Sequence, residues 1–131
     1  MREILFRGKR TDNGEWVYGS PVFQDGYVLI RFWNSEEFEE YLVSPATVSE
    51  YTGLKDKNGK RIFEGDIVSF NRTNALGYIN RRIGEVKYYT ELPVFYILAT
   101  TCDAWDWCDC FNIEVIGNIH DNAELLESDN K

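Results

Sequence analysis

The sequence predicts a mainly β fold: a small SH3-like or otherwise strongly bent β-barrel of about eight or nine short strands, with little helix. Most apolar runs are only about four to six residues long, and turn signals interrupt them roughly every ten residues. Apolar residues make up 44% of the 131-residue chain and aromatic residues 15%, enough to build a hydrophobic core. The length suits one domain, expected over residues 1–126, with a loose tail at 127–131.

Turn signals divide the first part of the chain into short strands. The Asn13–Gly14 pair predicts a hairpin turn, because both residue types accept a positive φ, and Asp25–Gly26 predicts a second turn. A strand is expected to end before Pro45, which has no backbone donor. The strands expected here cover residues 4–7, 16–19, 27–33 and 41–43.

The second part of the chain continues this pattern. Asn58–Gly59 predicts a tight turn, and Asp66 can accept hydrogen bonds from neighbouring backbone amides. Residues 71–80 read as a polar loop, and residues 122–127 could form one helical turn. The apolar or alternating runs here fall at residues 48–54, 60–63, 67–70, 84–89, 94–98 and 111–116, and 84–89 reads as a strand. The expected core residues are Ile62, Ile67, Val68, Val86, Val115 and Ile116.

Charge and composition exclude several classes of function. The net charge of −8 and the pI near 4.6 oppose binding driven by phosphate neutralisation. No apolar stretch approaches the roughly 20 residues that a membrane helix needs, and the first residues contain no apolar signal region. We therefore expect a cytoplasmic protein without membrane partners.

The cysteine and histidine residues offer little chemistry. Cys102, Cys108 and Cys110 are expected to be free thiols, because their number is odd and their spacing is not that of a structural zinc site. Together with His120 they could form a metal-binding set only if the fold gathers them. No plausible catalytic set is present, so we expect no enzyme, no cofactor and no metal.

Three groups of residues are candidates for binding. In an unbroken strand, the aromatic residues Trp105, Trp107 and Phe111 share one face and form either core or an interface. An acidic run could steer a basic partner or could simply be a solvated surface; its members are Glu36, Glu37, Glu39 and Glu40. A basic patch could bind nucleic acid if the fold gathers its members, which are Lys55, Lys57, Lys60, Arg61, Arg81 and Arg82.

Several strings occur in an order that resembles a known family. They are FRGKR, TDNGEWVYG, YTGLKDKNGKRIFEGDIV, GEVKYY and EVIGNIHDNAELL. From Ile4 to about Leu126 the chain resembles the YopX-like family of bacteriophage and prophage proteins. The resemblance implies a small β-rich phage protein of unknown molecular function, and it provides no catalytic residues to carry over.

These observations favour a non-enzymatic phage accessory protein. Its expected partner is a protein from the phage or the host, or a second copy of the same chain. The alternatives are a nucleic-acid-binding adaptor that uses the Lys/Arg patch, and an acidic decoy that occupies a host nucleic-acid-binding protein. An enzyme with a carboxylate-bound metal ranks last.

Overall fold

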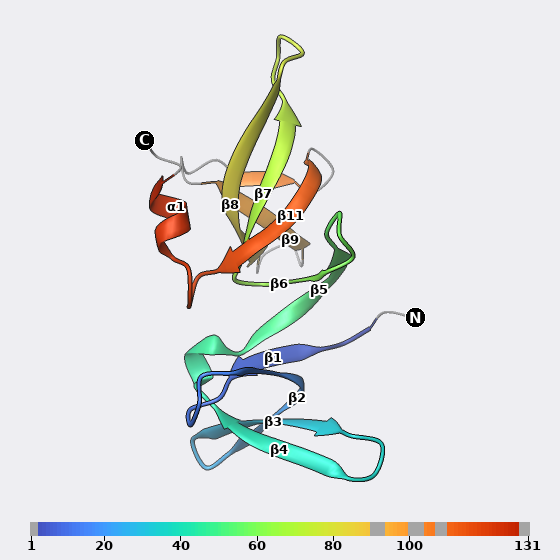
Figure 1. The fold of residues 1–131 in the computed structure, drawn as a ribbon, viewed down its shortest axis with the longest axis vertical. Coiled ribbons are helices and arrows are strands. Elements are labelled where there is room, and N and C mark those ends of the chain that lie inside the picture. Colours follow the sequence, from blue (N-terminus) through green and yellow to red (C-terminus); the bar gives the residue numbers. More distant parts are fainter. Residues whose placement is uncertain (1–2, 90–93, 100–103, 107–109, 129–131) are drawn as a thin grey trace. The chain divides into compact units, whose positions relative to one another are not determined.

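A computed structural model describes residues 3–89, 94–99, 104–106 and 110–128. Within these ranges the structure is mainly β, with antiparallel strands and one short α-helix, α1 (Glu124–Ser128). The chain divides into two compact units, Met1–Gly53 and Leu54–Lys131, which are described separately (Figure 1). The span expected as one domain therefore contains two units, each with its own hydrophobic core.

The first unit is one curved antiparallel sheet with the strand order β4-β3-β2-β1-β5. Its strands are β1 (Phe6–Lys9), β2 (Trp16–Gln24), β3 (Tyr27–Trp33), β4 (Phe38–Val43) and the start of β5 (Ser49–Lys55). A 3-10 turn, η1 (Pro45–Thr47), links β4 to β5. The core lies on one face of this sheet, where Val28, Ile30 and Val43 are buried against the half-buried residues Phe6, Val17 and Val48.

The sheet of the first unit curves back on itself. The end of β1 meets β4 at the opposite edge, where Thr11 N donates to Leu42 O at 3.1 Å and Ser44 N donates to Lys9 O at 2.9 Å. Gly8 permits this approach, because a Cβ at that position would lie 2.8 Å from Val43 Cγ2. The expected closed barrel is not formed by the described strands, which build open sheets around two separate cores.

The second unit contains a further antiparallel sheet, with the order β10-β9-β8-β7-β11. The last residues of β5 form a hairpin with β6 (Arg61–Phe63). The sheet strands are β7 (Asp66–Thr73), β8 (Ile79–Tyr89), β9 (Val94–Ala99), β10 (Ala104–Asp106) and β11 (Phe111–Asn118). In the described part of the chain, no helix is long and apolar enough to cross a membrane.

The core of the second unit agrees with most of the sequence prediction. Ile62, Val68 and Val86 are buried together with Phe70 and Ile97. Ile67 is also fully buried, whereas Val115 and Ile116 are only half-buried. Val115 still packs against the buried cluster, as do Phe95, Cys110 and Ile113.

Two segments differ from the prediction. The expected loop at 71–80 is mostly strand, because β7 continues to Thr73 and β8 begins at Ile79. The polar residues there belong to an exposed hairpin, in which polar side chains need no burial. Glu127 and Ser128 of the expected tail belong to α1, and residues 129–131 lie outside the described ranges.

A buried carboxylate fixes the tight turn that the sequence predicts at Asn58–Gly59. Asp56 Oδ1 accepts hydrogen bonds from the backbone N–H groups of Asn58 and Lys60, both at 2.9 Å. Asp56 Oδ2 accepts a third from Val115 N at 3.0 Å, which ties the turn to β11. Burial alone would raise the pKa of Asp56, but the three amide donors outweigh it and hold this pKa below its ordinary value.

Asp66 fills the role that the sequence assigned to it. Its side chain is buried, and Asp66 Oδ2 accepts a hydrogen bond from Phe63 N at 2.8 Å across the bend before β7. The bend also needs Gly65, whose φ of 87° lies in the left-handed region.

We predict that Gly8→Ala destabilises the first unit by about 1–3 kcal/mol, because the new methyl group would overlap Val43. Urea unfolding followed by tryptophan fluorescence measures the change. In a Val43→Ala background the same substitution should cost less, because the opposing methyl groups are gone. Equal costs in both backgrounds would contradict the close approach.

We predict that Asp56→Ala lowers the free energy of unfolding by about 2–3 kcal/mol at neutral pH, because three amide donors lose a charged acceptor. The folded-state pKa is depressed, so this contribution is present above the ordinary value of 3.8 and disappears as the pH falls through the lower folded-state pKa. Urea midpoints at pH 7 and in acid measure it. Glu15→Ala, at an exposed turn, is the control; an acid-insensitive difference would refute the prediction.

Candidate interaction surface

The hairpin that joins β3 to β4 has a rigid turn at residues 34–37. Asn34 Oδ1 accepts hydrogen bonds from the backbone N–H groups of Glu36 and Glu37, both at 2.9 Å. Asn34 N donates to Glu37 O at 3.0 Å and closes the turn. The side chains of Glu36 and Glu37 are exposed, so the turn holds two carboxylates in solvent at the tip of the hairpin.

Two aromatic side chains flank this turn. Trp33 is 57% exposed and Phe38 is 56% exposed, although their rings are in edge-to-face contact with centroids 5.0 Å apart. The Arg31 guanidinium lies 4.2 Å from the centre of the Phe38 ring, and Arg31 Nε is 3.4 Å from Glu40 Oε1. The contacts order the aromatic pair without burying it. We call residues 33–41 the acidic hairpin.

The strand register places these side chains on the face opposite the core. Trp33 lies opposite Phe38, Arg31 opposite Glu40, and Leu29 opposite Leu42. Because side chains alternate along a strand, these residues point away from the face that carries Val28 and Ile30. Leu42 is 41% exposed. The outer face of the first unit therefore carries apolar side chains that continue to the tip of the acidic hairpin.

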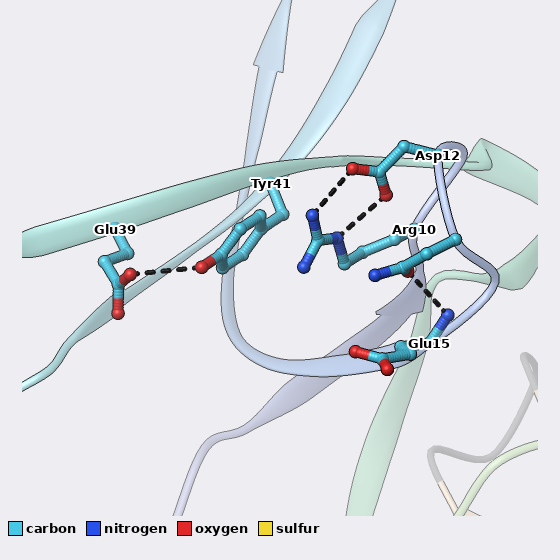
Figure 2. A network of polar contacts seen from close by, with 6 residues as sticks. Arg10, Asp12, Glu15, Glu39 and Tyr41 are labelled. Carbon is cyan, nitrogen blue, oxygen red and sulfur yellow. Dashed lines mark hydrogen bonds and ion pairs between the residues drawn. The ribbon is translucent and has the colours of Figure 1, made fainter.

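A separate polar network lies on the other face of β4 (Figure 2). Arg10 forms a two-pronged contact with Asp12, with Nε 2.9 Å from Oδ1 and Nη2 2.6 Å from Oδ2. The Arg10 guanidinium also lies 4.1 Å from the centre of the Tyr41 ring, and Tyr41 Oη donates to Glu39 Oε1 at 3.0 Å. This network connects the β1–β2 turn to β4.

The network perturbs the ionisation of its members. The hydrogen bond to Glu39 and the charge of that carboxylate raise the pKa of Tyr41. The hydrogen bond from Arg10 lowers the pKa of Asp12, and the same bond raises the pKa of Arg10. The predicted acidic run is thus divided, because Glu39 is engaged with Tyr41 on one face and Glu40 with Arg31 on the other. Glu36 and Glu37 remain at the turn.

The predicted aromatic surface is described only in part. Trp105 lies in β10 opposite Ile97, and Trp107 lies outside the described ranges. Phe111 begins β11 and is 39% exposed. Whether these three residues form one surface remains a prediction.

The predicted thiol cluster is also described only in part. Cys110 is a free, half-buried thiol that packs against the core of the second unit, and His120 is exposed. Cys102 and Cys108 lie outside the described ranges. Among the residues that the structure describes, no group of three or more His, Cys, Asp or Glu side chains could hold a metal ion.

The predicted basic residues belong to two hairpins of the second unit. Lys55, Lys57, Lys60 and Arg61 lie in the β5–β6 hairpin, whereas Arg81 and Arg82 lie in β8. Lys57 Nζ is 3.7 Å from Glu114 Oε1 of β11. Since the β5–β6 turn bonds to β11, and β7 lies between β11 and β8, the two groups come from opposite sides of β7.

Sequence reasoning missed Trp33 and Phe38 as surface residues. The signal was available in part, because alternation along 27–33 separates Trp33 from the apolar residues Val28 and Ile30. Which of the two faces is buried depends on contacts with β4 and β1, which the local pattern does not specify.

Comparison with known proteins identifies the family. The family model described as "YopX protein" matches residues 5–127, and the chain belongs to this family. Among solved structures, the chain is similar to the protein EF1440 from Enterococcus faecalis, with 26% identity and a TM-score of 0.59. That likeness covers 96% of this chain and 99% of the other. Among curated proteins, none matches the chain.

We predict that Glu39→Gln moves the pKa of Tyr41 back toward its ordinary value of 10.0, because the neutral amide removes the negative charge beside the phenol. The difference between the absorbance titrations of the wild type and of Tyr41→Phe gives the titration of Tyr41 alone. The same difference measured in the Glu39→Gln background gives the Tyr41 pKa without the carboxylate. Glu40→Gln, on the opposite face, should leave the Tyr41 pKa where it is. An unchanged pKa in Glu39→Gln would contradict the observed contact.

Proposed function

We propose that this chain is a phage or prophage accessory protein that acts in the bacterial cytoplasm as a non-enzymatic protein-binding module. Membership of the YopX family supports the proposed origin. The acidic hairpin is the proposed binding surface. The observation that carries the proposal is the exposed, mutually ordered pair of Trp33 and Phe38 beside the carboxylates of Glu36 and Glu37.

The geometry of this surface suits protein recognition. Large aromatic side chains contribute strongly to binding when a partner removes them from water, and Trp is enriched among such residues. The Trp33–Phe38 contact and the Arg31 guanidinium already order both rings, so little side-chain entropy remains to be lost on binding. Glu36 and Glu37 would favour a partner that presents Lys or Arg side chains next to an apolar group.

Nucleic-acid binding through the Lys/Arg residues is the second candidate function. Its specific support is the stretch from Ile67 to Gly84, which contains three arginines and no acidic residue. The net charge of −8 opposes it. The discriminating measurement is the salt dependence of oligonucleotide binding, because affinity that does not fall as salt rises would exclude phosphate neutralisation.

We predict that replacing both Trp33 and Phe38 by Ala abolishes partner capture while the protein stays folded. Both side chains are more than half exposed, so the free energy of unfolding should change by no more than about 1 kcal/mol in total. The measurement is affinity purification of the tagged chain from phage-bearing cells, with and without nuclease, read by mass spectrometry.

The control variant is Phe23→Ala, which removes an aromatic ring that is 74% exposed from a different strand of the same unit. It should retain every partner. Partners that bind the double variant as well as the wild type would refute the acidic hairpin as the binding surface. Partners that disappear with nuclease would instead support the nucleic-acid alternative.

A further inference from the structure

The β7–β8 hairpin extends beyond the rest of the second unit (Figure 1). An asparagine side chain orders its turn, as Asn34 does in the β3–β4 turn. Asn74 Oδ1 accepts hydrogen bonds from Leu76 N at 2.9 Å and Tyr78 N at 3.0 Å. Gly77 supplies the positive φ of 86° that this turn needs. We call residues 70–83 the arm.

The tip of the arm is apolar although it is exposed to solvent. Leu76 is 81% exposed, Tyr78 is 68% exposed and Ile79 is 62% exposed. None of these side chains contributes to the cores of the two units. Exposed apolar side chains that gather in one place are typical of a contact surface.

The charge of the arm is wholly positive. Arg72, Arg81 and Arg82 lie in it, and no Asp or Glu occurs between Ile67 and Gly84. Ile79 and Arg81 are two residues apart in β8, so they share a face of the hairpin. Arg81 is exposed, and within the described ranges its side chain makes no ion pair. The arm would therefore suit an acidic partner that also offers an apolar contact.

The acidic hairpin has this complementary composition. From Trp33 to Tyr41 it contains four glutamates and no Lys or Arg, and its exposed aromatic pair lies beside the turn. We propose that the arm of one copy of this chain binds the acidic hairpin of a second copy. This inference rests on the proposed function of the acidic hairpin as a protein-binding surface, and it identifies the partner as the chain itself.

The proposed contact joins two different surfaces, so it is heterologous. After one contact forms, each pair of molecules still has an unoccupied arm and an unoccupied acidic hairpin. Such contacts generate closed rings or growing chains rather than a single symmetric dimer interface. Because opposite charges align the surfaces, association should weaken as salt screens them.

The first experiment measures the mass of the full chain by multi-angle light scattering and analytical ultracentrifugation over a range of concentrations. It compares about 20 mM with about 500 mM salt, which changes the screening length several-fold. We expect species larger than the monomer at low salt and high concentration, and fewer of them at high salt. A monomer under all these conditions would overturn the inference.

The second experiment reverses the charge at the turn of the acidic hairpin in one variant and the charge of the arm in another. One variant carries Glu36→Lys and Glu37→Lys, and the other carries Arg72→Glu and Arg81→Glu. Each alone should remain monomeric. In the first variant the turn of the acidic hairpin is positive like the arm, while Glu39 and Glu40 stay engaged with Tyr41 and Arg31. In the second variant the arm, with two Glu and Arg82, is negative like the acidic hairpin. Circular dichroism and thermal melting test whether each variant is folded. If the arginine variant fails to fold, Leu76→Ala with Tyr78→Ala replaces it as the arm variant in this single-variant test. Both of these side chains are exposed, so their removal should leave the fold intact.

Mixing the two charge-reversed variants is the decisive test. The positive turn of one variant then matches the negative arm of the other, so a one-to-one mixture should associate again. General attraction does not explain such a rescue, because a change of four charge units in either direction leaves a chain of net charge −8 negative. The control, Glu15→Lys with Glu127→Lys, changes the net charge equally at exposed sites elsewhere and should associate like the wild type.

Two further outcomes would overturn the inference, and each has a different reading. Association that survives the arm variant but not the hairpin variant would keep the acidic hairpin as a binding surface and exclude the arm as its partner. Binding of a labelled oligonucleotide that depends on Arg72 and Arg81, without self-association, would assign the arm to nucleic acid. Loss of captured partners in Trp33→Ala with Phe38→Ala would still support the proposed function, so the two failures remain distinguishable.

Discussion

The second unit depends on one buried carboxylate. Asp56 accepts three backbone N–H groups, two within its own turn and one from Val115 of β11. The neighbouring Lys57 N donates to Ile113 O of the same strand. The turn is therefore joined to β11 by two hydrogen bonds, one at Ile113 and one at Val115. A carboxylate in this position is stable only while all its donors are present, because an unpaired buried charge is costly. Because β11 pairs with β7, the position of β11 also determines that of β7, whose far end belongs to the arm.

Both exposed hairpins use the same hydrogen-bond arrangement to hold their turns. Asn34 and Asn74 each direct a side-chain oxygen at two backbone N–H groups of their own turn. The backbone of each turn is thereby ordered, which would reduce the entropy lost in the proposed binding. The β3–β4 turn exposes Glu36 and Glu37 between Trp33 and Phe38. The β7–β8 hairpin exposes Leu76 and Tyr78 at its tip, and its strands carry Arg72, Arg81 and Arg82.

The family match extends over both units. It begins at residue 5 and ends at residue 127, so it includes the acidic hairpin, the Asp56 turn and the arm. The structural likeness to the Enterococcus faecalis protein spans 96% of the chain and leads to the same conclusion about extent. Neither finding assigns a ligand or partner to either hairpin.

Sequence by itself determined the local features of this protein: the tight turn at Asn58–Gly59, the bend at Asp66, and most of the strands and core residues around Ile62 and Val68. These signals reside in neighbouring residues, where glycine and asparagine permit particular backbone angles and alternation marks a buried face. Only the tertiary structure decided the division into two cores, the burial of Asp56 and the exposure of Trp33. Each depends on segments distant in the chain; Asp56 and Val115, for example, are 59 residues apart, and no local pattern specifies which distant strand supplies a donor or covers a face.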